Sequence, residues 1–534
     1  SKIDFYHLRL TDDSITAGFK GMVRLATNRQ GYIRTKGLVS NLSISNGKKT
    51  YRPEDIHMDV LSQKDSTYAR VDCGDFHFNA EGKGGYKKLL SQVNYLQRKT
   101  ARQLKDRKID QRSLMDHFPL ARIFLTSGND NFVYHVLEHY GYHFKNAEMD
   151  LTSSPARGLN GYIHLDSLAF KQVCLDTIRA LFKTEHDEIH YDLKVANNKD
   201  NPQYAFRALA NGKFTQQGSD IRAKLYDDQN RLGIDVGLAA MLEQHGIRVH
   251  LTDPHPLLGY KSFTANEDNY LYLGDDRRVS ANVVLRDSDG TGAQLTSNDE
   301  NTEALQDLTL SLNHVNLEKI FQVLPYTTDI SGDMSGDFHV TQTKDRFSVS
   351  SDIDVQNMVY DKCPMGNVGT EFVYVPKENG SHQVNGILLK DGNQVATIDG
   401  IYQPQGSGHI NARVKMEKTP LELLNGFIPD QLFGFKGKGE GTLTVKGSLK
   451  KPDVEGEIYL DSSYIYSDAY GVSMRFANDP VRIVGSHLLF ENFEVFANNN
   501  SPLNVSGTFD FSNLDRMMLD IRMRAHNFEL INAK

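Results

Sequence analysis

The sequence predicts a mainly β protein: an elongated, folded-over antiparallel sheet (a half-pipe) with an apolar groove and a few inserted helices. Three observations lead to this fold class. Much of the chain alternates apolar and polar residues, which is typical of strands that are apolar on one face only. One block recurs after about 105 residues, and repetition at a fixed period indicates a structure that extends along one axis. The composition, with 42 Gly, no Trp and 39% hydrophobic residues, suits half-exposed strands better than thick cores.

The clearest alternation lies in two consecutive predicted strands separated by a Pro-containing turn. Leu443 and Val445 fall on one face of the first strand, and Val454, Ile458 and Leu460 share one face of the second. Thr, Lys and Glu residues occupy most of the positions between them. Each strand is therefore predicted to have one apolar and one polar face.

The recurring block contains a short helix followed by two strands. Leu317–Pro325 matches Leu421–Pro429 at an offset of 104, and Ile330–Val340 matches Phe435–Val445 at an offset of 105. We interpret the two copies as one supersecondary unit used twice.

Five segments are predicted in order along the chain. Residues 1–82 alternate and form a β-groove segment, and residues 83–185 form a helix-containing insertion with strands. Residues 186–309 return to a β-groove segment, residues 310–415 form a β repeat with a leading short helix, and residues 416–534 form the second β repeat.

Helical spacing of apolar residues predicts three helices within the insertion. They are expected over 83–112, 131–141 and 168–182. A further short helix is expected over 238–244, and 288–300 is expected to be a polar surface loop.

The segment 83–112 carries ten Lys or Arg against two Asp, in a chain whose formal net charge is −8. A basic amphipathic helix can lie on anionic lipid or on an acidic partner. The simpler interpretation, which we favour, is a helix that covers one end of a sheet with its charges in water. The charge of the whole chain is too small to indicate nucleic acid as a partner.

Length and cysteine content set wide limits. The 534 residues allow two or more domains or one elongated array. Cys73, Cys174 and Cys363 are odd in number and far apart, so they indicate neither a disulfide framework nor a metal site. No apolar run reaches the roughly 18 residues of a membrane helix. The chain begins without Met, and we expect it to be an internal piece of a longer protein.

The sequence offers few candidates for catalysis. His135-Val-Leu-Glu-His139 fits the H-x-x-E-H pattern of inverted zinc peptidases, in which Glu138 would be the base. A catalytic zinc also needs a third ligand, and no Glu in a clearly helical context follows. Nearby tyrosines favour an aromatic packing face around these histidines.

Two loop-like motifs are also weak. Asp287–Gly292 resembles the start of a calcium loop, but Asn298 stands where the ligating Glu is expected. Gly437–Gly441 is glycine-rich, but an alternating strand follows it in place of a helix. We therefore expect no catalytic residue, no metal and no cofactor.

A long array of strands with one apolar face needs something to cover that face, because exposed apolar surface costs about 25 cal/mol per Å². Two sheets that close on each other would form a sandwich with an ordinary core. An open, folded-over sheet would instead leave a channel that acyl chains can fill. With roughly 30 to 40 strands about 4.8 Å apart, such an array could extend on the order of 150 Å.

Several motifs together resemble the TamB translocation and assembly module family. They are Leu421–Pro429, Phe435–Leu460, Ala469–Gly471, Pro480–Val484 and Leu503–Phe511. The motifs are degenerate one by one, and their order and spacing carry the resemblance, which covers the chain from about residue 310 to its end.

The resemblance implies a periplasmic, bridge-like carrier that conducts phospholipid between inner and outer membrane and supports the assembly of outer-membrane proteins. It also implies an inner-membrane anchor in a preceding segment and an Omp85-type (TamA-like) barrel as partner. Residues 416–534 would then begin the TamB-type C-terminal domain. The inward-facing residues that would line the lipid groove are Leu443, Val445, Val454, Ile458, Leu460, Leu503, Val505, Phe509, Phe511, Leu519, Ile521 and Met523.

Two other functions remain open at this point. The first is a β-rich scaffold or chaperone that binds client strands at its sheet edges. The second is a zinc hydrolase built on His135 and His139. Lipid content distinguishes a carrier from a scaffold, because edge pairing needs no apolar cavity.

Overall fold

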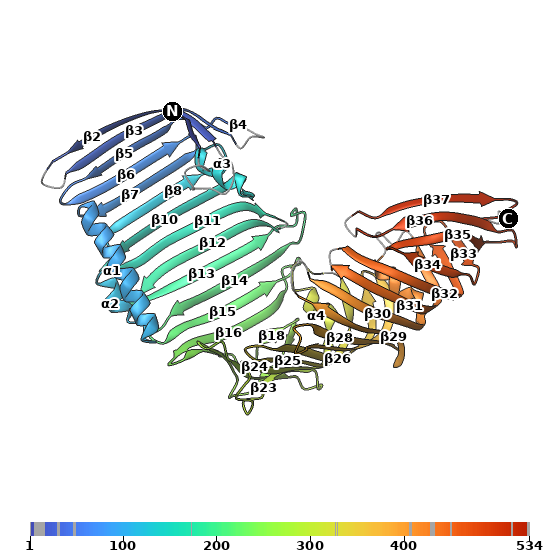
Figure 1. Ribbon diagram of the computed structural model, residues 1–534. Coiled ribbons are helices and arrows are strands. Elements are labelled where there is room, and N and C mark those ends of the chain that lie inside the picture. Colours follow the sequence, from blue (N-terminus) through green and yellow to red (C-terminus); the bar gives the residue numbers. More distant parts are fainter. Residues whose placement is uncertain are drawn as a thin grey trace. The chain divides into compact units, whose positions relative to one another are not determined.

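The computed structural model describes residues 2–4, 16–28, 32–45, 50–171, 173–325, 327, 329–404, 408–427, 433–448, 451–513 and 516–530. Most of these residues belong to strands, and nearly all strand pairs are antiparallel (Figure 1). The mainly β, antiparallel fold class is therefore confirmed. The chain forms two compact units. Unit 1 comprises residues 1–262 with 323–326, and unit 2 comprises residues 263–322 with 327–534. The boundary at residue 262 lies inside the predicted segment 186–309.

Unit 1 is a sheet in which most strands pair with their neighbours in sequence. Its helices are α1 (Tyr86–Lys105), α2 (Gln111–Met115) and α3 (Phe132–His139). Its strands are β1 (Lys2–Asp4), β2 (Thr16–Thr27), β3 (Ile33–Ser45), β4 (Thr50–Tyr51), β5 (Ile56–Ser62), β6 (Ser66–Cys73), β7 (Phe76–Lys83), β8 (Ala121–Ser127), β9 (Tyr142–His143), β10 (Asn146–Ser154), β11 (Gly158–Phe170), β12 (Val173–Glu185), β13 (Glu188–Asn197), β14 (Phe206–Phe214), β15 (Gly218–Tyr226), β16 (Leu232–Glu243), β17 (Gly246–Leu251), β18 (Leu257–Leu258) and β19 (Lys261–Ser262).

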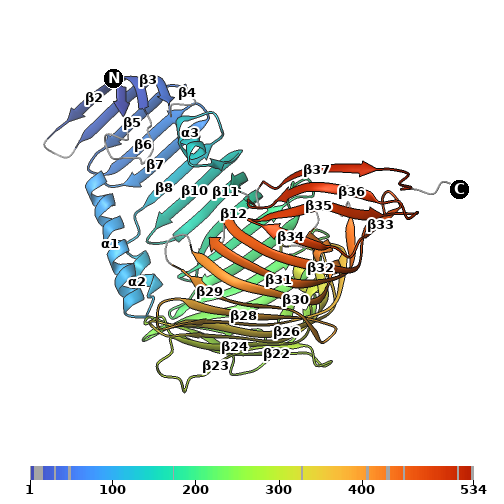
Figure 2. The same cartoon turned by 45° about the vertical axis from the view of Figure 1, so that its right-hand side comes forward.

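Unit 2 continues the same pattern with longer strands, which curve in Figure 2. Its helices are α4 (Leu317–Phe321) and the 3-10 helix η1 (Leu421–Phe427). Its strands are β20 (Thr264–Ala265), β21 (Tyr270–Gly274), β22 (Val279–Arg286), β23 (Gly292–Ser297), β24 (Gln306–Asn316), β25 (Ile330–Gln342), β26 (Phe347–Tyr360), β27 (Cys363–Pro376), β28 (His382–Lys390), β29 (Asn393–Gln403), β30 (His409–Pro420), β31 (Gly434–Ser448), β32 (Lys451–Ser467), β33 (Val472–Phe476), β34 (Pro480–Val484), β35 (His487–Phe496), β36 (Leu503–Asp510) and β37 (Met518–Ala525).

The two segments of the predicted repeat have the same order of elements within unit 2. The first copy is β24–α4–β25–β26 and the second is β30–η1–β31–β32. Their registers agree at the predicted offset, because Gly336 pairs with Ile353 and Gly441 pairs with Ile458. Each first long strand also carries a register shift at the same place, beside Gly332 in one copy and Gly437 in the other. Ile428 and Pro429, at the end of one repeat motif, lie outside the described residues.

The helix predictions are right at some places and wrong at others. Helices predicted over 83–112 and 131–141 correspond to α1, α2 and α3. The predicted helix over 168–182 is wrong, because this segment forms the end of β11 and most of β12. The predicted helix over 238–244 is also wrong, because it continues strand β16. The predicted loop over 288–300 contains strand β23.

Fully buried apolar side chains form small clusters rather than one central core. In unit 1, Ala17, Leu42 and Ile44 pack beside Phe132 of α3. In unit 2, one cluster lies under α4, and a second joins strands near the C-terminal end of the chain. The members of this second cluster are Val481, Phe493, Val495 and Val505. Long stretches of the apolar side of the sheet therefore lie outside any closed core.

Candidate functional site

One face of unit 1 is apolar from strand to strand. Directly opposed residues of an antiparallel pair project to the same face of the sheet, so the register identifies the residues of a face. One row of opposed residues crosses β2 to β16 without a polar member. The row consists of Val23, Gly37, Met58, Val71, Phe78, Leu125, Met149, Ile163, Ala180, Leu193, Ala210, Ala223 and Val236. We call the side of the sheet that carries this row the apolar face of unit 1.

The apolar face of unit 1 is open. Ile163 and Leu193, in the middle of the sheet, are each 40% exposed, and Ile123 on the same face is 38% exposed. Val23 and Leu25 near the first strands are about two-thirds exposed (65% and 66%). Large apolar side chains inside a sandwich would be buried by the second sheet. The exposure of these side chains in mid-sheet therefore excludes a closed sandwich for unit 1.

The opposite face of unit 1 is polar. The neighbouring row of opposed residues includes Lys36, Asp59, Arg70, Asp150 and Arg222. Several of these side chains form ion pairs across the strands: Arg34–Asp59 at 3.4 Å, Arg122–Asp150 at 2.6 Å and Arg222–Asp235 at 2.7 Å.

The ion pairs of the polar face lower the pKa values of their acidic members. A hydrogen bond from Arg122 lowers the pKa of Asp150, and one from Arg222 lowers the pKa of Asp235. Charges of the polar face thus pair with one another, whereas the apolar face has no such partner in the described chain.

Unit 2 has a corresponding apolar row that is longer. It passes through fifteen directly opposed positions from β22 to β37, of which only Ser351 is polar. The row consists of Val283, Leu295, Leu310, Phe338, Ser351, Phe372, Gly386, Ile398, Val414, Leu443, Gly456, Ile483, Leu488, Phe509 and Leu519. We call this side the apolar face of unit 2. Most of its members are half-buried.

Eleven of the twelve predicted groove residues lie in strands, on the apolar face of unit 2. Val445 opposes Val454, Ile458 opposes Val481, and Val505 opposes Met523. Leu460, Leu503 and Ile521 pack against the buried cluster that contains Val505. Leu443 opposes Val414, and Phe509 opposes Leu519. Leu519 and Met523, on β37, are 61% and 57% exposed. Phe511 lies just beyond β36, and its ring centroid is 6.0 Å from that of Phe509.

Sequence reasoning missed three members of this cluster, Val481, Phe493 and Val495, and the buried residue Ile483 close to Val481 in sequence. Val481 and Ile483 alternate in Pro480–Val484, and this signal was available. Phe493 was hidden because a register shift between Phe490 and Phe493 places both side chains on the apolar face although they are three residues apart. No residue of the open row of unit 1 was among the predicted groove residues, although residues 1–82 and 186–309 were predicted as β-groove segments, and Gly161, Ile163 and Leu165 alternate with polar or aromatic residues.

The weaker motifs do not assemble into sites. His135 Nδ1 lies 3.2 Å from Glu138 Oε2, and the His135 ring stacks on Tyr51 at 4.5 Å between ring centroids. Within the described ranges, no group of three His, Cys, Asp or Glu side chains is arranged to hold a metal ion. Gly437–Gly441 lies inside strand β31. His77 and His339 each pair with an aspartate on the polar side, Asp72 and Asp307.

An open hollow of about 700 Å³ also lies on the polar face of unit 1. Its walls include His190, Asp192 and Arg222. One of these wall residues, Arg222, forms an ion pair with Asp235. We assign no ligand to this hollow.

No helix among the described residues has the length and apolar character needed to cross a bilayer. Comparison of the chain with protein-family models, with curated proteins and with solved structures finds no match in any of the three. The resemblance to the TamB family therefore stays a prediction that rests on the motifs themselves.

Proposed function

We propose that the protein is a lipid carrier whose two apolar faces bind the acyl chains of phospholipids. The observation that carries this proposal is the uninterrupted apolar row of unit 1 combined with the exposure of Ile123, Ile163 and Leu193 in mid-sheet. Exposed apolar patches larger than a few hundred Å² are rare on soluble proteins and indicate an interaction surface.

The shape of the apolar face favours acyl chains over a compact ligand. The row of unit 1 contains thirteen opposed positions, so at about 4.8 Å per strand it extends roughly 60 Å. A single acyl chain reaches roughly 15 Å, half of a ~30 Å hydrocarbon core. Several lipids can thus lie along one face. The absence of polar side chains from this row allows chains to slide without breaking hydrogen bonds, since binding is non-directional.

The TamB resemblance extends this proposal to the place in the cell where the protein would act. In that setting the carrier conducts phospholipid across the periplasm between inner and outer membrane and supports outer-membrane protein assembly. An inner-membrane anchor and an Omp85-type (TamA-like) barrel would stand at its two ends. Passive sliding of acyl chains would need no catalytic residue.

Lipid extraction followed by mass spectrometry tests the proposal. The protein is purified, freed of excess detergent and compared with two variants that place a charge on an apolar face, Leu193→Asp in unit 1 and Val445→Asp in unit 2. Each has a control that places the same charge on the opposite face. Leu209→Asp is the control for unit 1, because Leu209 opposes Lys194 and Lys224. Thr444→Asp is the control for unit 2, because Thr444 opposes Arg413.

The wild-type protein is expected to retain several phospholipids per chain. Leu193→Asp and Val445→Asp are expected to reduce that number, and both control variants are expected to keep it. Circular dichroism verifies that each variant is folded. A lipid-free, well-folded wild-type protein would contradict the proposal and favour the scaffold that binds client strands at its edges. Equal loss of lipid in the variants and in their controls would also contradict it.

A further inference from the structure

Helix α1 lies along one border of the apolar face of unit 1. The side chain of Leu89 covers the apolar face at Gly82, where an added Cβ would lie 2.6 Å from Leu89 Cδ1. At the start of the helix, Tyr86 N donates to Ser62 Oγ at 2.9 Å. Beyond its other end, Ile109 N donates to Gln216 O at 2.8 Å in the turn between β14 and β15. Figure 1 shows α1 and α2 alongside the strand ends at one border of unit 1.

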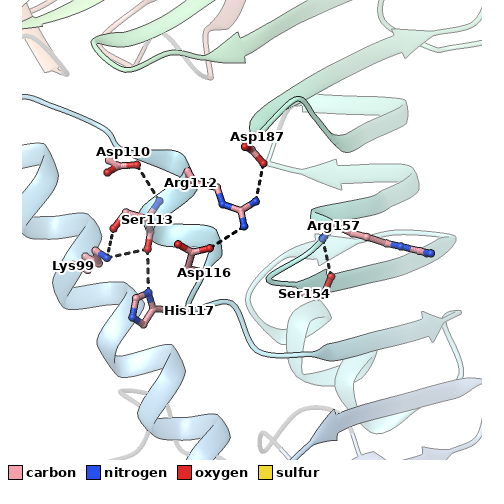
Figure 3. A network of polar contacts seen from close by, with 9 residues as sticks. All are labelled: Lys99, Asp110, Arg112, Ser113, Asp116, His117, Ser154, Arg157 and Asp187. Carbon is pink, nitrogen blue, oxygen red and sulfur yellow. Dashed lines mark hydrogen bonds and ion pairs between the residues drawn. The ribbon is translucent and has the colours of Figure 1, made fainter.

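Helix α2 fixes α1 in this position (Figure 3). The buried amide of Gln111 donates to Phe214 O at 2.7 Å and accepts from Ile189 N at 2.9 Å. Lys99 Nζ donates to Ser113 O at 2.9 Å. Arg112 forms ion pairs with Asp116 at 3.1 Å and Asp187 at 3.0 Å. These contacts hold α1 and α2 in a fixed position along the border of the apolar face.

The outer side of α1 carries positive charge that the protein does not neutralise locally. Residues 83–112 have ten basic and two acidic residues within a chain of net charge −8. Arg98, Arg102 and Lys105 are exposed, and in the part of the chain that the structure describes none of the three has a carboxylate partner. Side chains seven residues apart, such as Arg98 and Lys105, lie on one side of a helix.

A second, apolar flank of α1 lies between these charges and the sheet. Leu90, Val93 and Leu104 are 57%, 51% and 43% exposed. Helical spacing places them together on one flank. Tyr95 lies on the other flank, where its ring stacks on His117 of the segment after α2 at 4.5 Å between centroids. The surface thus passes from open apolar sheet, through an apolar helix flank, to unpaired basic side chains.

We infer that α1 is a headgroup-binding rim that selects phospholipids with a net negative headgroup, among the lipids whose acyl chains lie on the apolar face of unit 1. This inference rests on the proposed function. When the acyl chains of a lipid lie on the apolar face, its headgroup lies at the border of that face. The Lys and Arg side chains of α1 at this border can bind the phosphate and any further anionic group. The occupant is a lipid seated on the protein, because the apolar flank of α1 is continuous with the apolar face at Leu89 and Gly82.

The test compares the wild-type protein with Arg98→Gln/Arg102→Gln/Lys105→Gln. The matched control, Arg24→Gln/Arg179→Gln/Lys194→Gln, also removes two Arg and one Lys, but from exposed positions on the polar face. Each protein is loaded from an equimolar mixture of phosphatidylcholine and phosphatidylglycerol and separated from the vesicles. Mass spectrometry then gives the ratio of the two bound lipids, at low and at high salt.

Each ion pair between exposed groups strengthens binding severalfold or less. Three such pairs therefore predict that the wild-type protein binds about five times as much phosphatidylglycerol as phosphatidylcholine. The α1 variant is expected to lose this enrichment while keeping its total lipid, and the control variant is expected to keep both. High salt is expected to weaken the wild-type preference.

Three results would overturn the inference in different ways. Lipid bound without charge preference, or with equal preference in the α1 variant, would reject the headgroup rim and leave the lipid carrier standing. Flotation of the protein with phosphatidylglycerol vesicles that depends on the three side chains, without preference in the bound lipid, would assign α1 to a membrane surface instead. Absence of any bound lipid from the wild type would reject the proposed function and this inference with it.

Discussion

Asp227, in the turn between β15 and β16, has a carboxylate side chain that is only 1% exposed. It accepts hydrogen bonds from Tyr260 Oη at 2.5 Å, Arg231 Nε at 2.7 Å and Gln229 N at 3.0 Å. Burial raises the pKa of Asp227, but these hydrogen bonds outweigh it and the net pKa is lowered. Burial first, and the bond to Asp227 second, raise the pKa of Tyr260 to about 12. This contact ties the segment after β18 to the turn before β16.

The raised pKa of Tyr260 predicts a loss of stability at alkaline pH. The unfolded chain releases the phenolic proton near the ordinary value of about 10, whereas the folded chain keeps it to about 12. The contribution is therefore complete below pH 10 and is lost as the pH rises through 12. The urea concentration at the midpoint of unfolding should fall across this pH range. The Tyr260→Phe variant should be less stable than the wild type at neutral pH, but its midpoint should fall less as the pH rises. An unchanged alkaline slope in Tyr260→Phe would contradict this prediction.

At the scale of single residues, alternation in the sequence was sufficient to predict that most of the proposed groove residues share one face of the sheet. Leu443, Val445 and Val454 face as predicted because their strands run without a shift across these positions. Phe490 and Phe493 could not be placed by the same rule. A register shift near Asn492, which has a φ of 55°, reverses the alternation between them. Such a shift depends on the partner strand as well as on the residues themselves.

At the scale of elements, each segment of the predicted repeat has a glycine where two strands approach closely: Gly336 in one, and Gly441 in the other, where an added Cβ would lie 2.1 Å from the carbonyl oxygen of Glu457. Gly336 has a φ of 137°, and a Cβ there would lie 2.0 Å from the carbonyl oxygen of Asp352 on the next strand. No side chain can relieve this contact, because the obstacle is backbone. Both the backbone conformation and the close approach therefore require glycine at this position.

Gly336→Ala is expected to lower the free energy of unfolding of unit 2 by about 1–3 kcal/mol or more, because it adds a backbone clash to an unfavourable φ. Gly392→Ala is the matched control. Gly392 also has a positive φ, of 76°, but a Cβ there would meet nothing within 4 Å. The control should therefore lose less stability in chemical denaturation. An equal decrease in the free energy of unfolding of the two variants would contradict the prediction, because the close approach of the strands at Gly336 would then add no destabilisation.

The two wrongly predicted helices have different physical causes. Cys174 and Ile178 are four residues apart in β12, and a spacing of four fits one face of a helix and also one face of a strand. Phe170 is the last residue of β11 and projects to the other face. Around Leu238 both faces of β16 carry apolar residues, so the period is not visible there. Helix α1 was predictable because its basic residues prevent a strand-like alternation of apolar and polar residues along its 20 residues. That α1 borders the apolar face could not be predicted, since its contacts to Ser62 and Gln216 join distant parts of the sequence.

At the scale of the whole molecule, the open faces predict that the lipid-free protein is unstable as a dispersed species. Exposed apolar surface costs about 25 cal/mol per Å², and a second copy of the chain can cover it. Protein stripped of lipid is therefore expected to self-associate, as measured by light scattering, and to disperse again when phospholipid is restored. Reloading should also raise the melting temperature, because a ligand that binds only the folded state stabilises it.

The Leu193→Asp variant provides the control for this association. It interrupts the apolar row of unit 1 and should scatter less than the wild type when lipid-free, whereas Leu209→Asp should behave as the wild type. Lipid-free wild-type protein that stays monomeric with an unchanged melting temperature on reloading would contradict the idea that lipid covers these faces.

The pairing of most strands with their neighbours in sequence has a consequence for how the molecule is made. Many of the turns are only a few residues long, as between β12 and β13 or between β28 and β29. Closing short loops costs little conformational entropy, and local contacts form early. A growing chain can add one hairpin after another to an existing edge, in the order of its synthesis. Evolution can lengthen such a sheet in the same way, because a duplicated block of strands finds both an edge to pair with and a face to extend.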